Sequence, residues 1–150
     1  MPSIFEKKIA DQFVERINKL RETSTPNWGS MGAAEMLAHC NVTYEMAYTD
    51  KYPKPNFLLK LILKAFVKKV VTSEVPYPKN SRTAPVFLIR DSRNFETEKK
   101  RLVEHINKTQ TLGAQHFDQR ESHSFGPLSS AEWNNMLYKH LDHHLTQFGV

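Results

Sequence analysis

The stretch SSAEWNNMLYKHLDHHLTQF, residues 129–148, decides the fold. Its apolar residues recur every three or four positions, which is the period of one face of an α-helix. Ser129 and Glu132 have the spacing of a capping box, in which each side chain bonds the backbone N–H of the other residue. This stretch therefore predicts a long amphipathic helix that begins at Ser129 and packs one face on a core.

Further segments carry the same helical period between proline and glycine breaks. The predicted helices cover residues 4–21, 31–48, 57–71 and 92–110. No segment predicts a strand, and the stretches 72–91 and 113–128 predict irregular connections. The expected fold class is all-α, with four long helices in a bundle and one additional short helical segment at the side. Residues 1–150 are expected to form a single domain.

Composition limits the classes of function. The formal net charge is +5, but the lysines are spread along the chain and no aromatic–basic signature accompanies them, so we expect no nucleic-acid partner. The single cysteine, Cys40, cannot form an internal disulfide, and the first residues show no signal-peptide pattern. These features favour a cytoplasmic protein.

Two histidines of the last helix lie on its core-facing stripe. At about 100° per residue, His140 and His144 fall near Trp133 and Leu137 around the helix. A buried imidazole without a partner is costly, whereas a divalent metal would bind one nitrogen of each ring. Side chains at i and i+4 lie about 6 Å apart and can converge on one ion. The alternative is an ordinary hydrogen-bonded pair, because this spacing also occurs by chance.

A third histidine, His39, lies in AEMLAHC within the most apolar predicted helix and is the candidate third ligand. Glu35, one turn earlier, could orient the ring or supply a carboxylate oxygen. Its alternative role is that of a helix N-terminal acid stabilised by the helix dipole. Cys40 projects about 100° away from His39 and is expected in the core. The other histidines are expected to be solvated, although the last could reach the open side of a metal: His105, His116 and His123.

Two motifs carry a resemblance to a known family. WGSMGAAEMLAH, residues 28–39, and the F-G-x-L-S-x-x-E-W...Y-K-H-L-D-H-H-L-x-Q-F-G pattern at 125–149 resemble the DinB/YfiT superfamily of proposed metalloenzymes. The nearest likeness is to a branch known only as a domain of unknown function. The resemblance implies a DinB-type four-helix bundle with up-down-down-up connectivity, often dimeric. It also implies that His39, His140 and His144 bind nickel, zinc or a similar divalent ion.

The resemblance implies a small-molecule substrate and, for several relatives, a low-molecular-weight thiol cosubstrate. We therefore expect a metal-dependent enzyme, either a thiol-dependent transferase or a hydrolase, with an open position on the ion. Glu35 and His143 are the candidate catalytic bases, while His143 and Gln147 match the family pattern around the site. The alternative is a non-catalytic metal-binding or small-ligand-binding protein in stress response, with a saturated metal shell.

FLLKLILKAFVKKVV, residues 57–71, places Lys60, Lys64 and Lys68 on one polar stripe. The pattern is typical of a bundle helix with a solvated face, and it leaves a homodimer contact open. It also has the apolar face and lysines of an interfacial helix, but it is too short and lysine-rich to span a bilayer. We expect no stable membrane association.

Overall fold

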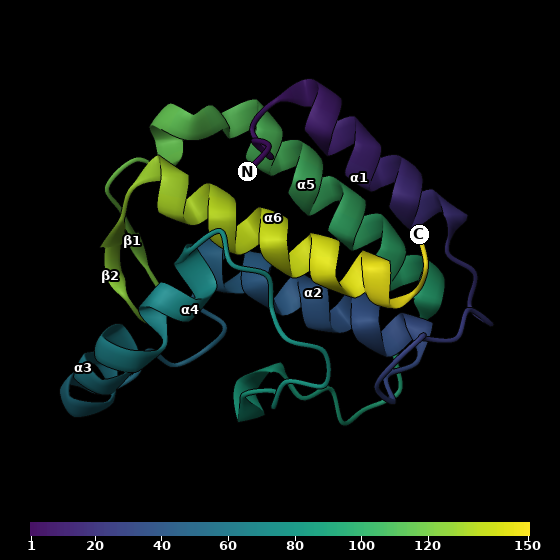
Figure 1. The fold of residues 1–150 in the computed structure, drawn as a ribbon, viewed down its shortest axis with the longest axis horizontal. Coiled ribbons are helices and arrows are strands. Elements are labelled where there is room, and N and C mark those ends of the chain that lie inside the picture. The colour runs from purple at the N-terminus through teal and green to yellow at the C-terminus, as the bar shows by residue number, and fades with distance from the viewer.

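The computed structural model describes residues 1–150, and four long helices carry its core (Figure 1). These are α1 (Lys7–Lys19), α2 (Ala33–Tyr48), α5 (Phe95–Phe117) and α6 (Ser130–Gln147). The shorter elements are α3 (Phe57–Phe66), α4 (Lys68–Thr72), the 3₁₀-helix η1 (Pro85–Phe87), β1 (Arg120–Ser122) and β2 (Gly126–Leu128). The expected all-α character therefore holds in its broad outline, with one small sheet added.

The start of α6 confirms the predicted capping box. The backbone N–H of Glu132 donates to Oγ of Ser129 at 3.2 Å, and the N–H of Ser129 donates to the Glu132 carboxylate at 2.9 Å. At α5 the side-chain oxygen of Asn94 accepts the N–H of Thr97 at 2.9 Å. Each bond pairs an N–H that the first helical turn leaves without a backbone acceptor.

Helices α1 and α6 run in one direction, and α2 and α5 run in the opposite one (Figure 1). The backbone N–H of Ile4, before α1, donates to Asn134 near the start of α6 at 2.7 Å. Arg16 near the end of α1 reaches Asp142 in the second half of α6, also at 2.7 Å. The chain order is therefore up, down, down, up. The parallel pair α2 and α5 is possible because residues 49–94 form a long connection.

The core is one cluster of 20 buried residues drawn mainly from the four long helices. Trp133 and Leu137 of α6 are buried in it, as the apolar stripe of that helix predicts. Helix α2 is buried around most of its circumference, as expected for the most apolar predicted helix. No helix has both the length and the apolar character needed to cross a membrane.

The prediction of an irregular connection over 113–128 is wrong in two respects. Helix α5 continues to Phe117 through a kink at Gly113, whose φ is 73°. The chain then forms an antiparallel hairpin in which Arg120 pairs with Leu128. Strands of three residues are too short to show an alternating pattern, so they could not be predicted from the residues alone.

The segment 57–71 also differs from the prediction of one continuous helix. It is divided at Val67 into α3 and α4, and α3 contains no buried residue. In Figure 1, α3 projects away from the four long helices at the end of the molecule that carries the hairpin. The expectation that this segment is a bundle helix with one solvated face is therefore wrong for α3, which lies outside the four long helices.

Candidate metal centre

Helices α2 and α6 bring the three predicted ligands together. His39 lies on α2, while His140 and His144 lie one turn apart on α6. The ring centroids are 4.9 Å apart for His39 and His140, 4.5 Å for His39 and His144, and 4.8 Å for His140 and His144. One nitrogen from each ring lies within 4.8 Å of the other two.

The outer hydrogen bond of His39 fixes its tautomer. Its Nδ1 lies 3.0 Å from the carbonyl oxygen of Phe87, and a carbonyl can only accept, so Nδ1 carries the hydrogen. Nε2 of His39 is then left with a lone pair that points into the group. Nε2 of His140 lies 2.9 Å from it, while Nδ1 of His140 lies 3.2 Å from Oγ1 of Thr43. Because the Thr43 hydroxyl can donate or accept, His140 can present a lone pair to a metal or a proton to His39.

His144 is fixed by a chain of two hydrogen bonds. The side-chain amide of Gln147 donates from Nε2 to the carbonyl oxygen of Trp28 at 2.6 Å. Oε1 of Gln147 therefore faces Nδ1 of His144, at 2.9 Å, and accepts its hydrogen. The remaining nitrogen of His144, Nε2, keeps its lone pair. This arrangement of an imidazole held by an outer acceptor is typical of metal ligands.

Gly29 permits the chain around Trp28 to approach Gln147. Its φ is 78°, in the left-handed region, and a Cβ added there would lie 2.7 Å from Nε2 of Gln147. Any other residue would be strained and would push the amide away from its position. The W-G motif, Trp28 and Gly29, therefore helps to orient His144 through the side chain of Gln147.

Burial keeps all three rings neutral. Desolvation lowers the pKa of His39, and it lowers the pKa of His140 further, well below the usual value, with help from the neighbouring histidines. Burial lowers the pKa of His144 to about 3, and the charge that His39 would carry if it were protonated acts in the same direction. Neutral imidazole is the form that binds a metal. The donor set of three neutral rings, two with tautomers fixed for binding, therefore fits a divalent ion such as zinc or nickel.

A cavity of about 520 Å³ opens onto the three histidines. Its walls come from α2, α3, α4, α6, the hairpin and residues 77–87, and half of the lining residues are apolar. Arg82 is its only lysine, arginine or carboxylate side chain. Cavities of about 300–1,000 Å³ with few polar groups are typical of small-molecule sites.

The two candidate bases lie in different places. His143 lines the cavity, with its ring 5.0 Å from that of His144 and edge-on to Trp28 at 5.9 Å. Glu35 does not line this cavity. Its carboxylate accepts the backbone N–H of Gly32 at 3.3 Å, which is the helix N-terminal role considered from the sequence. The structure thus brings His143 to the site and leaves Glu35 at the start of α2.

Three groups that hold the histidines were missed from the sequence. Thr43 lies one turn after His39 on α2, and this i+4 spacing was an available signal. Phe87 and Trp28 act through backbone carbonyls, which any residue carries, so no side-chain pattern could have identified them.

The structure also shows where the cysteine and two of the other histidines lie. Cys40 is fully buried and free, which confirms its expected place in the core. His105 was expected to be solvated but is half-buried, stacked on Tyr44 at 5.4 Å and bonded to Asn41 at 2.9 Å. His123, which was expected to be solvated but able to reach the open side of the site, is half-buried and lines the same cavity as the histidine group.

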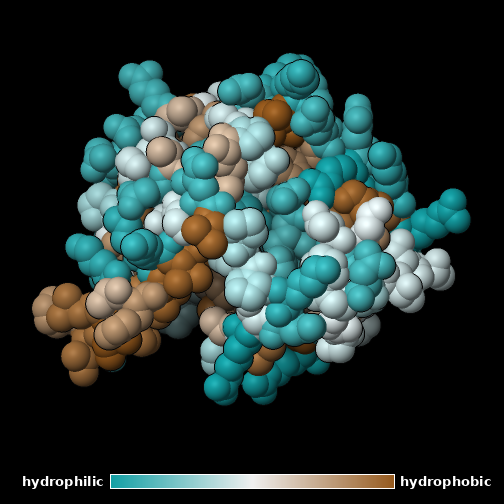
Figure 2. Space-filling view, in the orientation of Figure 1, coloured by the Kyte–Doolittle hydropathy of each residue, from teal (hydrophilic) through white to brown (hydrophobic).

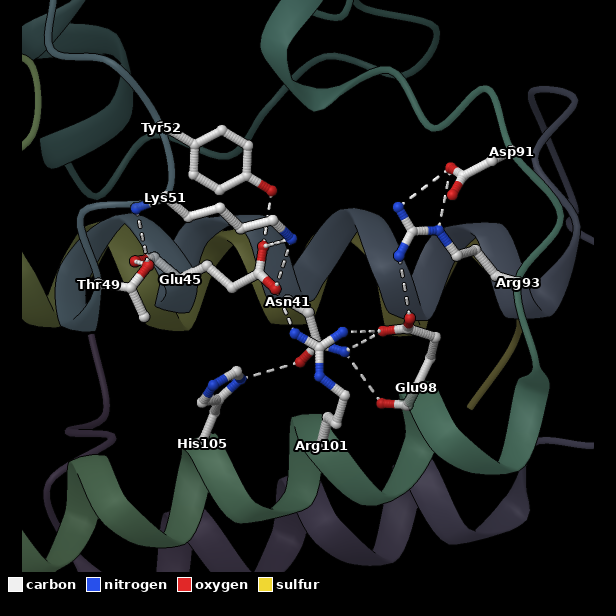
Figure 3. A network of polar contacts seen from close by, with 10 residues as sticks. All are labelled: Asn41, Glu45, Thr49, Lys51, Tyr52, Asp91, Arg93, Glu98, Arg101 and His105. Carbon is white, nitrogen blue, oxygen red and sulfur yellow. Dashed lines mark hydrogen bonds and ion pairs between the residues drawn. The ribbon is translucent and has the colours of Figure 1, made fainter.

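A second buried polar group, the carboxylate network, lies between α2 and α5 (Figure 3). Glu98 accepts hydrogen bonds from Asn41 at 2.8 Å and Arg101 at 2.8 Å, and it pairs with Arg93 at 3.3 Å. Glu45 accepts from Tyr52 at 2.6 Å and Lys51 at 3.1 Å, and it contacts Arg101. Both carboxylates are thus fully partnered within the protein. The members of the network are Asn41, Glu45, Thr49, Lys51, Tyr52, Asp91, Arg93, Glu98, Arg101 and His105.

The fold and the site define a class: a mainly helical protein with a buried three-histidine group that could hold a metal ion. Within that class the chain belongs to the DUF1569 family, described as a protein of unknown function, which matches residues 6–149. No curated protein and no solved structure matches the chain. The expectation that the chain belongs to a family of unknown function is therefore confirmed. Membership of this family does not indicate which reaction, if any, the protein catalyses.

Proposed function

We propose that this protein is a divalent-metal-dependent enzyme in which His39, His140 and His144 bind the ion. The observation that carries the proposal is the set of outer hydrogen bonds. Phe87 and Gln147 accept the Nδ1 hydrogens of His39 and His144, which leaves two Nε2 lone pairs directed into the group with the ring of His140. Without an ion, a proton of His140 could pair with the lone pair of His39, but the Nε2 lone pair of His144 has no hydrogen-bond partner in the protein.

We also propose that the bundle is of the DinB type. Its support is the up, down, down, up order of the long helices, together with the position of the histidines on α2 and α6. The cytoplasmic location and the possible homodimer remain predictions. Nickel or zinc is the proposed ion, because imidazole nitrogen is a favourable ligand for both.

The reaction proposed is transfer of a group to a low-molecular-weight thiol, or hydrolysis, on a small and largely apolar substrate. When bound, the ion would lower the pKa of a coordinated thiol or water toward neutrality. The cavity walls would bind the apolar part of the substrate and exclude water from it. His143, beside His144 on the same wall, would accept the proton that the nucleophile releases.

Cobalt substitution tests whether the ion has an open position. The protein would be loaded with Co²⁺, and glutathione would then be added while the visible and near-ultraviolet spectrum is recorded. A new thiolate-to-metal absorption, absent from His140→Ala, is expected if a thiol reaches the ion. A cobalt spectrum that neither thiol nor azide alters would contradict an enzyme and indicate the alternative, a non-catalytic binding protein with a saturated shell.

Activity is then measured with two kinds of probe. Chlorodinitrobenzene with glutathione reports thiol transfer, and a 4-nitrophenyl ester reports hydrolysis. We expect metal-dependent turnover with at least one probe, lost in His140→Ala. His143→Gln should retain the metal but lower turnover by about 10²-fold or more. Unchanged turnover in His143→Gln would remove the proposed base while leaving the metal site intact.

A further inference from the structure

Helix α3 presents an apolar face to solvent that the rest of the structure does not cover. Phe57 and Phe66, at its two ends, are 78% and 74% exposed. Figure 2 shows the helix as a hydrophobic projection from an otherwise mainly polar surface. The outward apolar residues are Phe57, Leu58, Leu61, Ile62 and Phe66. A contiguous apolar surface of this kind marks an interaction site.

The other side of α3 already has a partner. Leu59, Leu63 and Val67 line the cavity above the three histidines. The outward residues are therefore not needed for the cavity, and their apolar character requires another explanation. A helix that only covered the cavity would carry polar residues on its outer side.

The charged residues of the segment that contains α3 are all of one sign. Residues 51–73 contain six lysines and no aspartate or glutamate. Three of these lysines pair with acidic residues elsewhere in the chain, at Glu45, Glu121 and Glu132. The other three, which have no acidic partner, are Lys54, Lys64 and Lys69. An occupant of this surface must therefore accept both apolar side chains and positive charge.

We propose that α3 docks on an anionic membrane surface. A second copy of the chain would bring two sets of unpaired lysines together, and their repulsion opposes a dimer through this face. Anionic lipid headgroups instead attract the lysines while the acyl region receives the apolar side chains. Ten residues of helix extend only about 15 Å, so α3 would lie in the interface and not cross it.

This inference reverses the expectation of no membrane association, because that expectation rested on α3 being a bundle helix. The structure shows that α3 lies outside the bundle with its apolar side toward solvent. The proposal is independent of the metal site, since none of the outward residues lines the cavity that opens onto the histidines.

Vesicle co-sedimentation tests the proposal. Tag-free protein would be mixed with vesicles of phosphatidylglycerol and phosphatidylcholine in equal parts, or of phosphatidylcholine alone. We expect binding to the anionic vesicles that weakens as salt is raised. The double variant Phe57→Ser/Phe66→Ser should bind about tenfold more weakly or worse, because two aromatic side chains no longer enter the interface. Lys54→Gln/Lys64→Gln/Lys69→Gln should also bind at least about tenfold more weakly.

Leu88→Ser provides the matched control, because Leu88 is exposed but lies outside α3. It should bind vesicles as the wild type does, and circular dichroism should show that every variant remains helical. Failure of the wild type to sediment with anionic vesicles would overturn the proposal. So would a dimer in ultracentrifugation that Phe57→Ser/Phe66→Ser converts to a monomer, since that result would assign the face to a second copy.

Discussion

Helix α2 carries buried polar groups toward two neighbours, and the two clusters differ in kind. Toward α5, in the carboxylate network, every charge of Glu45 and Glu98 meets a donor within the protein. Toward α6, the three histidines have outer partners, but their inner nitrogens meet mainly one another. The first cluster is complete without a ligand, whereas the inner nitrogens of the second lie close enough together that they could hold a cation. Completeness of partners thus separates a structural polar cluster from a binding site.

The two clusters should also respond differently to substitution. A buried carboxylate network loses much of its stability when one charge is removed, because the other charges remain without a partner. Neutral imidazoles are not paired with a buried charge, so replacing one leaves no charge without a partner. Such a replacement should therefore lower the free energy of unfolding less and should mainly remove metal binding.

The largest effect is expected in the carboxylate network. Glu98→Ala should lower the free energy of unfolding by about 3 kcal/mol, because Arg93, Arg101 and Asn41 all lose a partner that is buried. Urea unfolding at neutral pH measures the loss. Asp91→Ala is the control, since Asp91 pairs with Arg93 at the surface and its removal should have little effect. A loss for Glu98→Ala as small as that of Asp91→Ala would show that the network is not structural.

The next effect concerns the residues that orient the histidines. Gln147→Leu and Thr43→Val should each weaken zinc or nickel binding by about 10–100-fold, because they remove the outer partners of His144 and His140. Competition with a chromophoric chelator measures the affinity. Thr109→Val, which removes a buried hydroxyl bonded to Tyr48, is the matched control and should keep wild-type affinity. Equal affinities in all three variants would contradict the role assigned to the outer bonds.

A smaller effect is expected at Gly29. Gly29→Ala and Gly113→Ala place a side chain at similar positive φ, 78° and 73°, and each should cost about 1 kcal/mol of stability or more. Only at Gly29 would the new Cβ meet Gln147, whereas at Gly113 nothing lies within 4 Å of it. Gly29→Ala should therefore also weaken metal binding, and Gly113→Ala should not. Identical metal affinities of Gly29→Ala and Gly113→Ala would show that Gly29 does not affect the histidine site.

The smallest effect is a dependence of stability on pH. Burial raises the pKa of Glu45, but hydrogen bonds from Tyr52, Lys51 and Arg101 outweigh it and hold the pKa below its ordinary value. The stabilisation is therefore present above the unfolded-state pKa of about 4.3 and is lost as pH falls through the lower folded-state pKa. Unfolding at a series of acidic pH values should show a steeper loss for wild type than for Glu45→Gln. If the stability of wild type and of Glu45→Gln fell equally with pH, Glu45 would not be the source of the pH dependence.

The sequence predicted the long helices and the histidine group because both depend on local patterns. The apolar period and the Ser129–Glu132 capping box determine α6, and the core stripe places His140 and His144 inward. His39 was predictable because a histidine in an apolar helix needs a partner.

The features that were missed depend on contacts between distant segments. The carbonyl of Phe87, the last residue of η1, bonds His39 across 48 residues of sequence, and Gln147 bonds Trp28 across 119 residues. His105 was expected at the surface because its own helix is polar, yet Asn41 and Tyr44 of α2 cover it. No local period in the sequence contains these pairings.

The most direct test of the central claim is the metal content of tag-free protein after incubation with zinc or nickel and dialysis. Wild type would be compared with His39→Ala and His144→Ala, and with His105→Ala as a histidine control outside the group. We expect about one ion per chain in wild type and in His105→Ala, and none in His39→Ala or His144→Ala. Wild type without metal, or metal retained when His39 or His144 is removed, would contradict this claim.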